Sequence, residues 1–382
     1  MLTATVQFCG AGGTSEGACL ADIHVEAAIN HSKTAIATHE ANHKGCQYFQ
    51  QDITEIDPDD VPDSDLLLTS PECTNHSDSK GQKHYHQFDL FGDIVFDPLD
   101  EKSRNTMEDV VRFAKAKLSA GKPYKCIVVE NVIEVVKWRK YASWFASLVA
   151  LGYQYQALYW NTQFFGVPQS RDRVYLVFWL RDLPAPDLDF RPTAFCEYCE
   201  RVIQAVQAWK TLLKWGSYRE QYVYRCQCCA NEVTPFFIPV ASVLNLDSPG
   251  DPLFQRTSGR ILKKKTIDGI RKGMERFQGQ PFLYAYYKKP LYRCLNEPVG
   301  TITTMDRWAL VIPGRTFEET TYRMLTPHEV KLCMGFSAEY RVLGTKKEQV
   351  WQLGNAVCPP IMADILRRCA VAIASSDEQE AA

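Results

Sequence analysis

The sequence lacks the features of a membrane or secreted protein. Its 382 residues contain no run of 18 apolar residues, and its longest mainly apolar stretches, Cys126–Val136 and Val174–Leu180, have the length of strands. The N-terminal residues lack a charged segment followed by a long apolar one, so we expect no signal peptide and a cytoplasmic protein. Internal repeats are absent too, and 46% hydrophobic and 23% charged residues exclude disordered and fibrous classes.

An excess of positive charge is also missing. The 43 Lys and Arg residues against 45 Asp and Glu residues give a net charge of −2, so any surface for a nucleic acid has to be local. A disulfide scaffold is not indicated either, because the 14 cysteines are spread over the whole chain and several lie inside apolar runs. Reduced thiols, with catalytic or metal-binding roles for a few, are the better interpretation.

Short apolar runs alternate with helix-like segments in the first half of the chain. Val6–Phe8, Leu66–Thr69, Cys126–Asn131 and Val174–Leu180 have the pattern of strands, and residues 105–120 have the apolar spacing of a helix. This alternation predicts an α/β fold, with a mainly parallel sheet and helices on both of its faces.

A glycine-rich segment, Cys9–Gly17, follows the first strand and opens a helix. That position suits a loop whose backbone passes close to a nucleotide-like cofactor, although such turns also occur for steric reasons alone. Its spacing is not G-x-G-x-x-G, so a nicotinamide cofactor is disfavoured.

Three further patterns place reactive side chains beside the ends of apolar strands. Cys73 follows the strand at Leu66–Thr69 and is either a thiolate nucleophile or a small core residue. Glu130 ends another strand, where an acid is costly without a partner or a function. Arg171 and Arg173 alternate onto one face, which suits the binding of one anionic or polar group, or salt bridges to neighbouring carboxylates.

Together, and in this order, these motifs resemble those of the DNA (cytosine-5)-methyltransferase family over nearly all of the chain outside 188–296. The glycine-rich segment is similar to the family's cofactor loop, Pro71–Cys73 to its nucleophile motif and Glu130–Val132 to its acid motif. Three further motifs match: Gln169-x-Arg171-x-Arg173, Pro298–Met305 and Gly354-Asn355-Ala356-Val357. The resemblance implies a Rossmann-like S-adenosylmethionine-dependent methyltransferase sheet with an inserted, smaller target-recognition domain.

The resemblance implies methyl transfer from S-adenosylmethionine to carbon 5 of a cytosine in a specific duplex DNA sequence. Cys73 would add to carbon 6 of the ring as a thiolate, which makes carbon 5 nucleophilic. Glu130 would bind N3 and the exocyclic amine, Arg173 would hold O2, and Arg171 would brace the cysteine loop. Because these atoms are out of reach in a stacked duplex, the cytosine would be flipped out.

Cofactor contacts are implied as well, with Asp52 on the adenine amino group and Asn30 on the ribose. The family has an acid where this chain has Asn30, whose only acceptor is a carbonyl oxygen, so weaker or rearranged ribose binding is expected. The implied cofactor-binding residues are Phe8, Gly10, Gly12, Asn30, His31, Asp52, Ile53, Asn355 and Val357.

Glu72 is a second departure, since the family has proline between Pro71 and Cys73. A carboxylate beside the thiol raises the thiol pKa unless it points away or pairs with an arginine. Thr74 replaces a more usual glutamine. These changes leave open an altered methyl donor or a catalytically degenerate relative that binds DNA without modifying it.

Two cysteine pairs, Cys196-x-x-Cys199 and Cys226-x-x-Cys229, flank residues 200–225. Four thiolates suit a tetrahedral structural zinc ion, which would stabilise a small zinc ribbon-like module without taking part in the chemistry. Cys228 is an alternative fourth ligand, and a disulfide or free thiols are the alternative states. Between the pairs, Trp209–Trp215 is expected to be helical.

Positive charge concentrates in residues 256–293. This segment holds 11 Lys and Arg residues against Asp268 and Glu275, a balance of 11 − 2 = +9, with tyrosines interleaved. Such a stretch indicates a surface that contacts DNA phosphates, and a solvated charged face is the alternative. The residues expected to bind DNA are Arg256, Arg260, Lys263, Lys264, Lys265, Arg271 and Lys272.

The expected organisation has four segments. Residues 1–187 form the first part of the catalytic domain, 188–296 the target-recognition domain with the zinc site, 297–374 a return to the catalytic domain, and 375–382 a disordered tail. We expect a monomer of bacterial or phage origin that binds duplex DNA in the cytoplasm, with a cognate restriction endonuclease as a partner in the same host. Methylation of tRNA is the alternative that keeps the chemistry.

Overall fold

The computed structural model describes residues 1–71, 106–257, 259, 261–287 and 289–376, and the backbone alone at 87–88, 94–95, 98–105 and 377–380. The chain forms two compact units. Unit 1 comprises Met1–Asn161, Asp172–Pro235 and Pro359–Ala382, and unit 2 comprises Thr162–Arg171 and Phe236–Cys358. Both units are therefore discontinuous in sequence.

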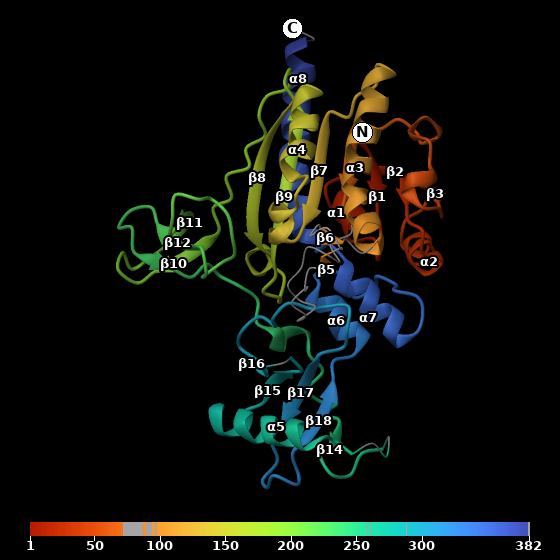
Figure 1. Ribbon diagram of the computed structural model, residues 1–382. Coiled ribbons are helices and arrows are strands. Elements are labelled where there is room, and N and C mark those ends of the chain that lie inside the picture. Colours follow the sequence, from red (N-terminus) through yellow and green to blue (C-terminus); the bar gives the residue numbers. More distant parts are fainter. Residues whose placement is uncertain are drawn as a thin grey trace. The chain divides into compact units, whose positions relative to one another are not determined.

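A seven-stranded sheet forms the centre of unit 1 (Figure 1). Its strands are β1 (Thr3–Gln7), β2 (His24–Ile29), β3 (Gln47–Phe49), β4 (Leu66–Thr69), β7 (Cys126–Asn131), β8 (Tyr153–Asn161) and β9 (Asp172–Leu180). They follow the order β3-β2-β1-β4-β7-β9-β8, and all pairs are parallel except those that β9 makes. The predicted mainly parallel sheet is confirmed. Because the chain runs from β1 outward to β3 and then returns to β4, the sheet has a topological switch point between β1 and β4.

Helices cover both faces of this sheet, as predicted (Figure 1). They are α1 (Gly13–Leu20), α2 (Lys33–Asn42), α3 (Pro98–Ser119), α4 (Tyr141–Ala150) and α8 (Pro359–Glu380). Cys126 of β7 contacts Cys369 of α8 on one face. Phe178 of β9 is paired with the next residue of β7, so it points to the opposite face, where it packs against Trp144 of α4 with ring centroids 6.1 Å apart. At Gly17 of α1, a Cβ atom would lie 2.7 Å from a side-chain atom of α8, so this packing needs glycine.

Two boundaries differ from the sequence expectations. α3 begins at Pro98 rather than near residue 105. α8 continues to Glu380, so the expectation of a disordered tail from Ser375 is wrong for the backbone up to that residue. A polar, acidic end can extend an established helix because Glu and Gln are good helix formers and need no nucleation there. Short elements complete the unit: η1 (Ile53–Glu55), η2 (Pro58–Asp60), η4 (Ile133–Lys137), β5 (Gln87–Phe88) and β6 (Ile94–Val95).

The cysteine-containing segment forms a separate four-stranded antiparallel sheet within unit 1. Its strands, in spatial order, are β10 (Thr193–Cys196), β11 (Arg201–Trp209), β12 (Tyr222–Cys226) and β13 (Glu232–Val233). The expectation of a helix at Trp209–Trp215 is wrong: Trp209 ends β11, where it pairs with Tyr222, and cross-strand aromatic packing outweighs the helical spacing. The segment 188–296, predicted to be one domain, is divided between the two units after Pro235.

Unit 2 is built on a five-stranded antiparallel sheet with the order β14-β18-β17-β15-β16 (Figure 1). Its elements are η5 (Thr162–Phe165), η6 (Val240–Val243), β14 (Asp251–Pro252), α5 (Lys264–Arg276), β15 (Phe282–Ala285), β16 (Leu291–Cys294), β17 (Trp308–Ile312), β18 (Thr321–Met324), α6 (Pro327–Cys333) and α7 (Lys346–Asn355). α5 packs on one face, where Ile270 joins Phe282 and Tyr284 in a buried core. Capping boxes at Thr326 and Thr345 fix the starts of α6 and α7. Over the described part of the chain, no helix has both the length and the apolar character that a membrane span requires.

Candidate active site and metal centre

Three of the expected cofactor-binding segments lie at one edge of the sheet in unit 1. Phe8, Asn30 and Asp52 each follow a strand, and β1, β2 and β3 are parallel neighbours whose carboxyl ends meet there. Main-chain hydrogen bonds join the loops directly: Cys9 N donates to Ile29 O at 3.1 Å, and Asn30 N donates to Phe49 O at 3.1 Å. The expected contacts are thus brought together as a continuous rim beside the switch point.

The glycine-rich loop holds an unusual backbone conformation. Phe8 has φ 57°, a left-handed conformation that a bulky side chain adopts only at a cost of roughly 1–3 kcal/mol. Gly10 and Gly12 also have positive φ, and Gly12 is the N-cap of α1. A Cβ atom at Gly10 would meet only Phe8 O, at 3.7 Å, so the space beside this glycine is open. Such strain, together with open space at a helix N-terminus, is typical of a ligand-binding loop.

The residues expected at the adenosine hold local structure as well. Asn30 Oδ1 accepts a hydrogen bond from Ser32 N at 2.8 Å, and Asp52 Oδ1 accepts from Thr54 N at 3.2 Å. His31 is exposed, and Ile53 is buried at the start of η1. The two polar side chains therefore shape the loops after β2 and β3, and their ligand roles remain predictions.

Arg112 of α3 is a residue that sequence reasoning missed. Its guanidinium donates to Ile53 O and to Ile56 O, both at 2.7 Å, and it also bonds to Asp109. Burial raises the pKa of the Asp109 carboxyl although Arg112 bonds to it. Arg112 thus fixes the loop that carries Asp52, and no sequence pattern distinguishes it from the other charged residues of the helix.

Unpartnered polar atoms gather at the same edge of the sheet. Gln7 is 1% exposed, and both its amide oxygen and its amide nitrogen lack a hydrogen-bond partner among the described residues. Thr69, which pairs with Gln7 across β1 and β4, and the following Ser70 have buried hydroxyls in the same condition. Because buried polar groups are normally satisfied, this cluster beside the switch point indicates a place for a polar ligand. Gln7 is a signal that the sequence does carry, as a polar residue that ends an apolar strand.

Glu130 and Arg173, which are both expected at the catalytic site, form an ion pair. Glu130 Oε1 lies 3.1 Å from Arg173 Nε, with the side chains 9% and 15% exposed. Glu130 pairs with Tyr175 across β7 and β9, and Arg173 is two residues from Tyr175, so both charged side chains point to the same face. The sequence placed both residues at the site, and their direct contact is a finding of the structure.

The end of β4 is tied to the end of β7. Asn131 Nδ2 donates to Pro71 O at 3.3 Å, and its Oδ1 accepts from Val132 N at 2.8 Å. Pro71 is the first residue of the nucleophile motif and the last described residue before Cys73. Cys73, Glu72 and Thr74 lie outside the described residues.

Arg171 belongs to unit 2, unlike Arg173. It is 3% exposed and donates to Ile302 O at 2.8 Å and to Gly354 O at 3.1 Å, so it joins two other motifs of the predicted set. Asn355 is exposed at the end of α7, and Val357 is buried just after it. A Cβ atom at Gly354 would overlap the main chain at Thr303, which explains the glycine. The expected roles of Arg171 at the cysteine loop and of Asn355 and Val357 at the cofactor remain predictions.

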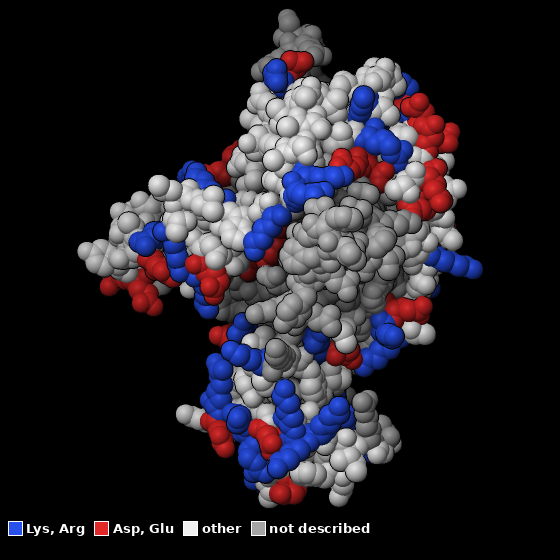
Figure 2. All heavy atoms as spheres, viewed as in Figure 1, with Lys and Arg blue, Asp and Glu red and all other residues white. Residues whose placement is uncertain are grey.

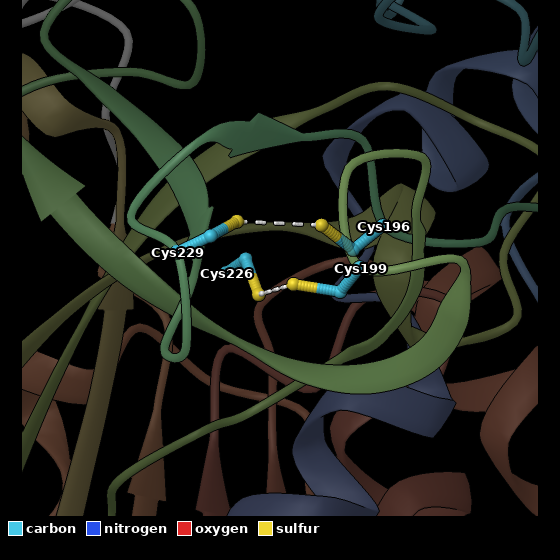
Figure 3. A group of neighbouring side chains, drawn as sticks. All are labelled: Cys196, Cys199, Cys226 and Cys229. Carbon is cyan, nitrogen blue, oxygen red and sulfur yellow. Dashed lines mark hydrogen bonds between the residues drawn. The ribbon is translucent and has the colours of Figure 1, made fainter.

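Four cysteines of the β10–β13 module form a cluster with the geometry of a metal centre (Figure 3). The sulfur atoms of Cys196, Cys199, Cys226 and Cys229 all lie within 4.8 Å of one another and point toward a common centre. Cys228 lies outside this set, because its sulfur accepts a hydrogen bond from Arg201 Nη2 at 3.0 Å. The geometry therefore favours Cys229 over Cys228 as the fourth ligand.

The electrostatics of the cluster fit a divalent cation. The amides of Cys229 and Cys228 lower the pKa of Cys226 to about 6, while the adjacent thiol of Cys229 raises the pKa of Cys199 to about 12. Four adjacent sulfurs cannot all be thiolates without a positive charge between them. Zinc, which prefers tetrahedral thiolate ligands, would supply that charge, and its binding here stays a prediction.

The expected DNA-binding residues in the described part of unit 2 lie on or beside α5. Lys263, Lys264, Lys265, Arg271 and Lys272 are exposed, and Figure 2 shows Lys and Arg gathered on this unit. Residues 264 and 271, like 265 and 272, are two helical turns apart and so share a face.

Arg256 differs from these exposed side chains. Its Cζ atom lies 5.1 Å from the Tyr322 ring centroid, and its Nε atom lies 4.0 Å from Asp251 Oδ2. The side chain is therefore largely buried against these two residues. Arg260 lies outside the described residues.

The family described as C-5 cytosine-specific DNA methylase matches residues 7–370. Type II methyltransferase M.NlaX of Neisseria lactamica is 24% identical over 98% of this chain and 97% of its own length, and M.BsuFI of Bacillus subtilis is 29% identical over 86% of this chain and 63% of its own.

Solved structures show the same fold. The methyltransferase EhMeth of Entamoeba histolytica aligns with a TM-score of 0.57 at 13% identity, over 97% of this chain and 98% of that protein. A DNMT2 variant of Spodoptera frugiperda aligns with a TM-score of 0.56 at 14% identity, over 97% and 100% of the two chains. The match of the family along almost the whole sequence decides the assignment: the chain belongs to the C-5 cytosine-specific DNA methylases.

Proposed function

We propose that this protein transfers a methyl group from S-adenosylmethionine to carbon 5 of a flipped-out cytosine in a specific duplex DNA sequence, through a covalent bond between Cys73 and carbon 6. The family assignment supports the reaction class. The Glu130–Arg173 ion pair is the observation that supports cytosine as the base.

The order of charges in this pair complements one edge of cytosine. That edge presents a donor amine, the ring N3 and an acceptor O2 in sequence. A carboxylate next to a guanidinium, 3.1 Å apart and mostly buried, offers an acceptor followed by donors. Uracil and thymine carry a carbonyl oxygen in place of the amine, so the Glu130 carboxylate would repel them.

Residues of unit 1 fit the cofactor. The open, strained loop at Phe8 and Gly10 would take the methionine part, and Gln7 and Thr69, whose side chains have no hydrogen-bond partner among the described residues, would offer polar atoms beside it. Asn30 and Asp52 would bind the ribose and the adenine amine. When bound, S-adenosylmethionine supplies the electrophilic methyl group.

The chain's own residues would drive the ring chemistry. The Cys73 thiolate would form a bond to carbon 6, and the electron pair of the ring double bond would shift toward carbon 5. Carbon 5 would then take the methyl group, leaving the donor as a neutral thioether. With a proton on its carboxyl, Glu130 would donate to N3 and accept from the amine, so that the charge moving through the ring is neutralised at N3, while Arg173 would donate to O2. Loss of the carbon 5 proton to a base then restores the double bond and expels the thiolate.

Target recognition is proposed for the predicted segment 188–296, with phosphate contacts on its unit 2 part. The exposed cations of α5 support that surface. The cysteine cluster is proposed to bind one structural zinc ion. The Type II relatives support a restriction–modification setting. The proposal adds that the protein acts as a monomer and that a cognate endonuclease is present in the same host.

Trapping on DNA that contains 5-fluorocytosine tests the proposal, because fluorine cannot leave carbon 5 as a proton does. We expect a stable protein–DNA adduct that depends on S-adenosylmethionine, no adduct with Cys73→Ser, and a normal adduct with the control Cys228→Ser, whose thiol is exposed. Adduct formation with 5-fluorocytosine-containing tRNA but not with duplex DNA would show that the substrate is tRNA and not DNA. Absence of any adduct, with DNA binding intact, would make the protein a binding relative.

A further inference from the structure

The four cysteines lie at one end of a hairpin whose other end reaches the active-site strands. Cys199 precedes β11, and Cys226 ends β12. The two strands pair in register from Ala205 with Cys226 to Trp209 with Tyr222. Residues 210–221 connect the strands at the end opposite the cysteines.

The hairpin has a small aromatic core that depends on this pairing. Tyr222 and Tyr224 are 0% and 1% exposed, and Trp209 and Tyr218 pack against Tyr222 with ring centroids 5.2 and 5.9 Å apart. A module of this size has little apolar core of its own, so a cross-link at the cysteines contributes much of its order.

The 210–221 loop makes two hydrogen bonds to segments that carry the Glu130–Arg173 pair. Trp215 Nε1 donates to Ile133 O at 3.1 Å, three residues after Glu130. Tyr218 N donates to Asp172 Oδ1 at 2.9 Å, next to Arg173 in sequence.

The hydrogen bonds of Trp215 and Tyr218 are both close enough to Glu130 and Arg173 to affect the position of this ion pair. The Lys137 ammonium lies 5.2 Å from the Trp215 ring centroid, which adds a second contact to η4. Arg173 Nη1 donates to the main-chain oxygen of Asp172 at 2.8 Å, so the residue held by the loop also holds the guanidinium.

The hydrogen bond from the Tyr218 amide stabilises the Asp172 carboxylate. Burial raises the pKa of its carboxyl to about 6, whereas the Tyr218 amide, the Asn161 side chain and the Arg173 charge lower it. At neutral pH the carboxylate is therefore charged and mostly out of water, and losing the Tyr218 amide would leave it poorly solvated. The start of β9 would then rearrange, together with Arg173.

We propose that the four-cysteine module positions the Glu130–Arg173 pair through Trp215 and Asp172, and that zinc bound at the cysteines maintains this positioning. Zinc would thus stabilise the fold of the module and, through the module, the position of the base-binding pair. The catalytic consequence rests on the proposed function, whereas the structural coupling does not.

Hydrogen–deuterium exchange of the full chain, read by mass spectrometry, tests the coupling without any activity. Removal of zinc with a chelator, or Cys199→Ser, is expected to raise exchange in peptides that cover 193–229, 130–137 and 172–175. Peptides from β2 in the same unit and β15 in unit 2 should not change, and Cys228→Ser should behave as wild type. Faster exchange confined to 193–229, with 130–137 and 172–175 as protected as before, would overturn the proposal.

Variants that keep the metal separate positioning from folding. Trp215→Phe keeps a smaller aromatic ring at the position but loses the N–H donor. Asp172→Ala loses the acceptor, whereas Asp172→Asn retains an acceptor oxygen. We expect kcat to fall about tenfold or more in the first two, with KM for S-adenosylmethionine unchanged, zinc content at one per chain, and recovery in Asp172→Asn. Trp351→Phe, at an exposed position on α7, is the matched control. Unchanged kcat in both Trp215→Phe and Asp172→Ala would refute the positioning role, and absence of methylation in wild type would instead refute the proposed function.

Discussion

Glu130→Gln is the sharpest perturbation of the proposed base-binding pair. The amide retains an oxygen that can accept from Arg173 Nε, 3.1 Å away, but removes the negative charge. Loss of one partner of a buried ion pair costs roughly 3–5 kcal/mol. Because the amide still accepts a hydrogen bond and both side chains keep some exposure, we expect a loss of about 1–2 kcal/mol of unfolding free energy. A domain with a stability of roughly 5–15 kcal/mol stays folded after such a loss.

The expected effect on the reaction is larger than the effect on stability. An amide at this position has no carboxyl proton to transfer to N3, so the charge that moves into the ring as the thiolate adds is less stabilised, and kcat should fall about 10²- to 10³-fold. Discrimination against deoxyuridine should also weaken, because the new amide can donate to the carbonyl oxygen that the carboxylate would repel.

Single-turnover methyl transfer from labelled S-adenosylmethionine, beside urea unfolding and a DNA-binding assay, separates these effects. Glu108→Gln is the control, since Glu108 forms an exposed ion pair with Lys140 at 3.4 Å. A Glu130→Gln variant with a rate within about threefold of wild type would refute the assigned role. So would a loss of rate that follows only the fraction unfolded.

Three further predictions concern other parts of the molecule. Burial lowers the pKa of His39 to about 3 and of His43 to about 4, below the unfolded value near 6.5, so the stability that these neutral side chains contribute is fully present above pH 6.5 and is lost as the pH falls. Urea unfolding should therefore show a free energy of unfolding that is roughly 2–4 kcal/mol lower at pH 5 than at neutral pH. An unfolding free energy that does not change with pH would contradict this. Gly273→Ala should destabilise unit 2 by about 1–3 kcal/mol in spite of a better helix propensity, because a Cβ atom there would overlap the Phe282 ring, whereas an unchanged or higher melting temperature would count against it. Arg112→Ala should weaken S-adenosylmethionine binding about tenfold, because it removes the hydrogen bonds to two carbonyl oxygens of the loop after β3, and it should change kcat little. Calorimetry measures the affinity and steady-state kinetics measure kcat. An unchanged affinity would refute the role of Arg112 in holding this loop for the cofactor.

Local patterns were sufficient for much of the fold and for part of the site. Apolar runs such as Leu66–Thr69 are fully buried strands, and the residues that follow strands, Phe8 and Asn30 among them, lie at one edge as parallel pairing requires. The cysteine spacing predicted a four-thiol cluster, which the structure contains. Such features repeat at short sequence distance, so they can be recognised without knowledge of distant contacts.

Contacts between distant segments were beyond any local pattern. The bond of Arg112 to the loop after β3, the place of Cys228 beside Arg201, and the contact of Trp215 with Ile133 each join residues far apart in sequence. Trp209 shows the same limit, because its aromatic spacing fitted a helix until pairing with Tyr222 made it a strand end.

The sequence by itself determined the family, the order of strands and helices, and the residue types available for thiolate chemistry, because these depend on which residues stand near one another along the chain. Only the tertiary structure decided that Glu130 meets Arg173, that Arg171 bonds within unit 2, and that the cysteine module belongs to unit 1. Those outcomes depend on side-chain packing and on the pairing of distant hydrogen-bonding groups, which fold the chain into one geometry among many that share the same pattern.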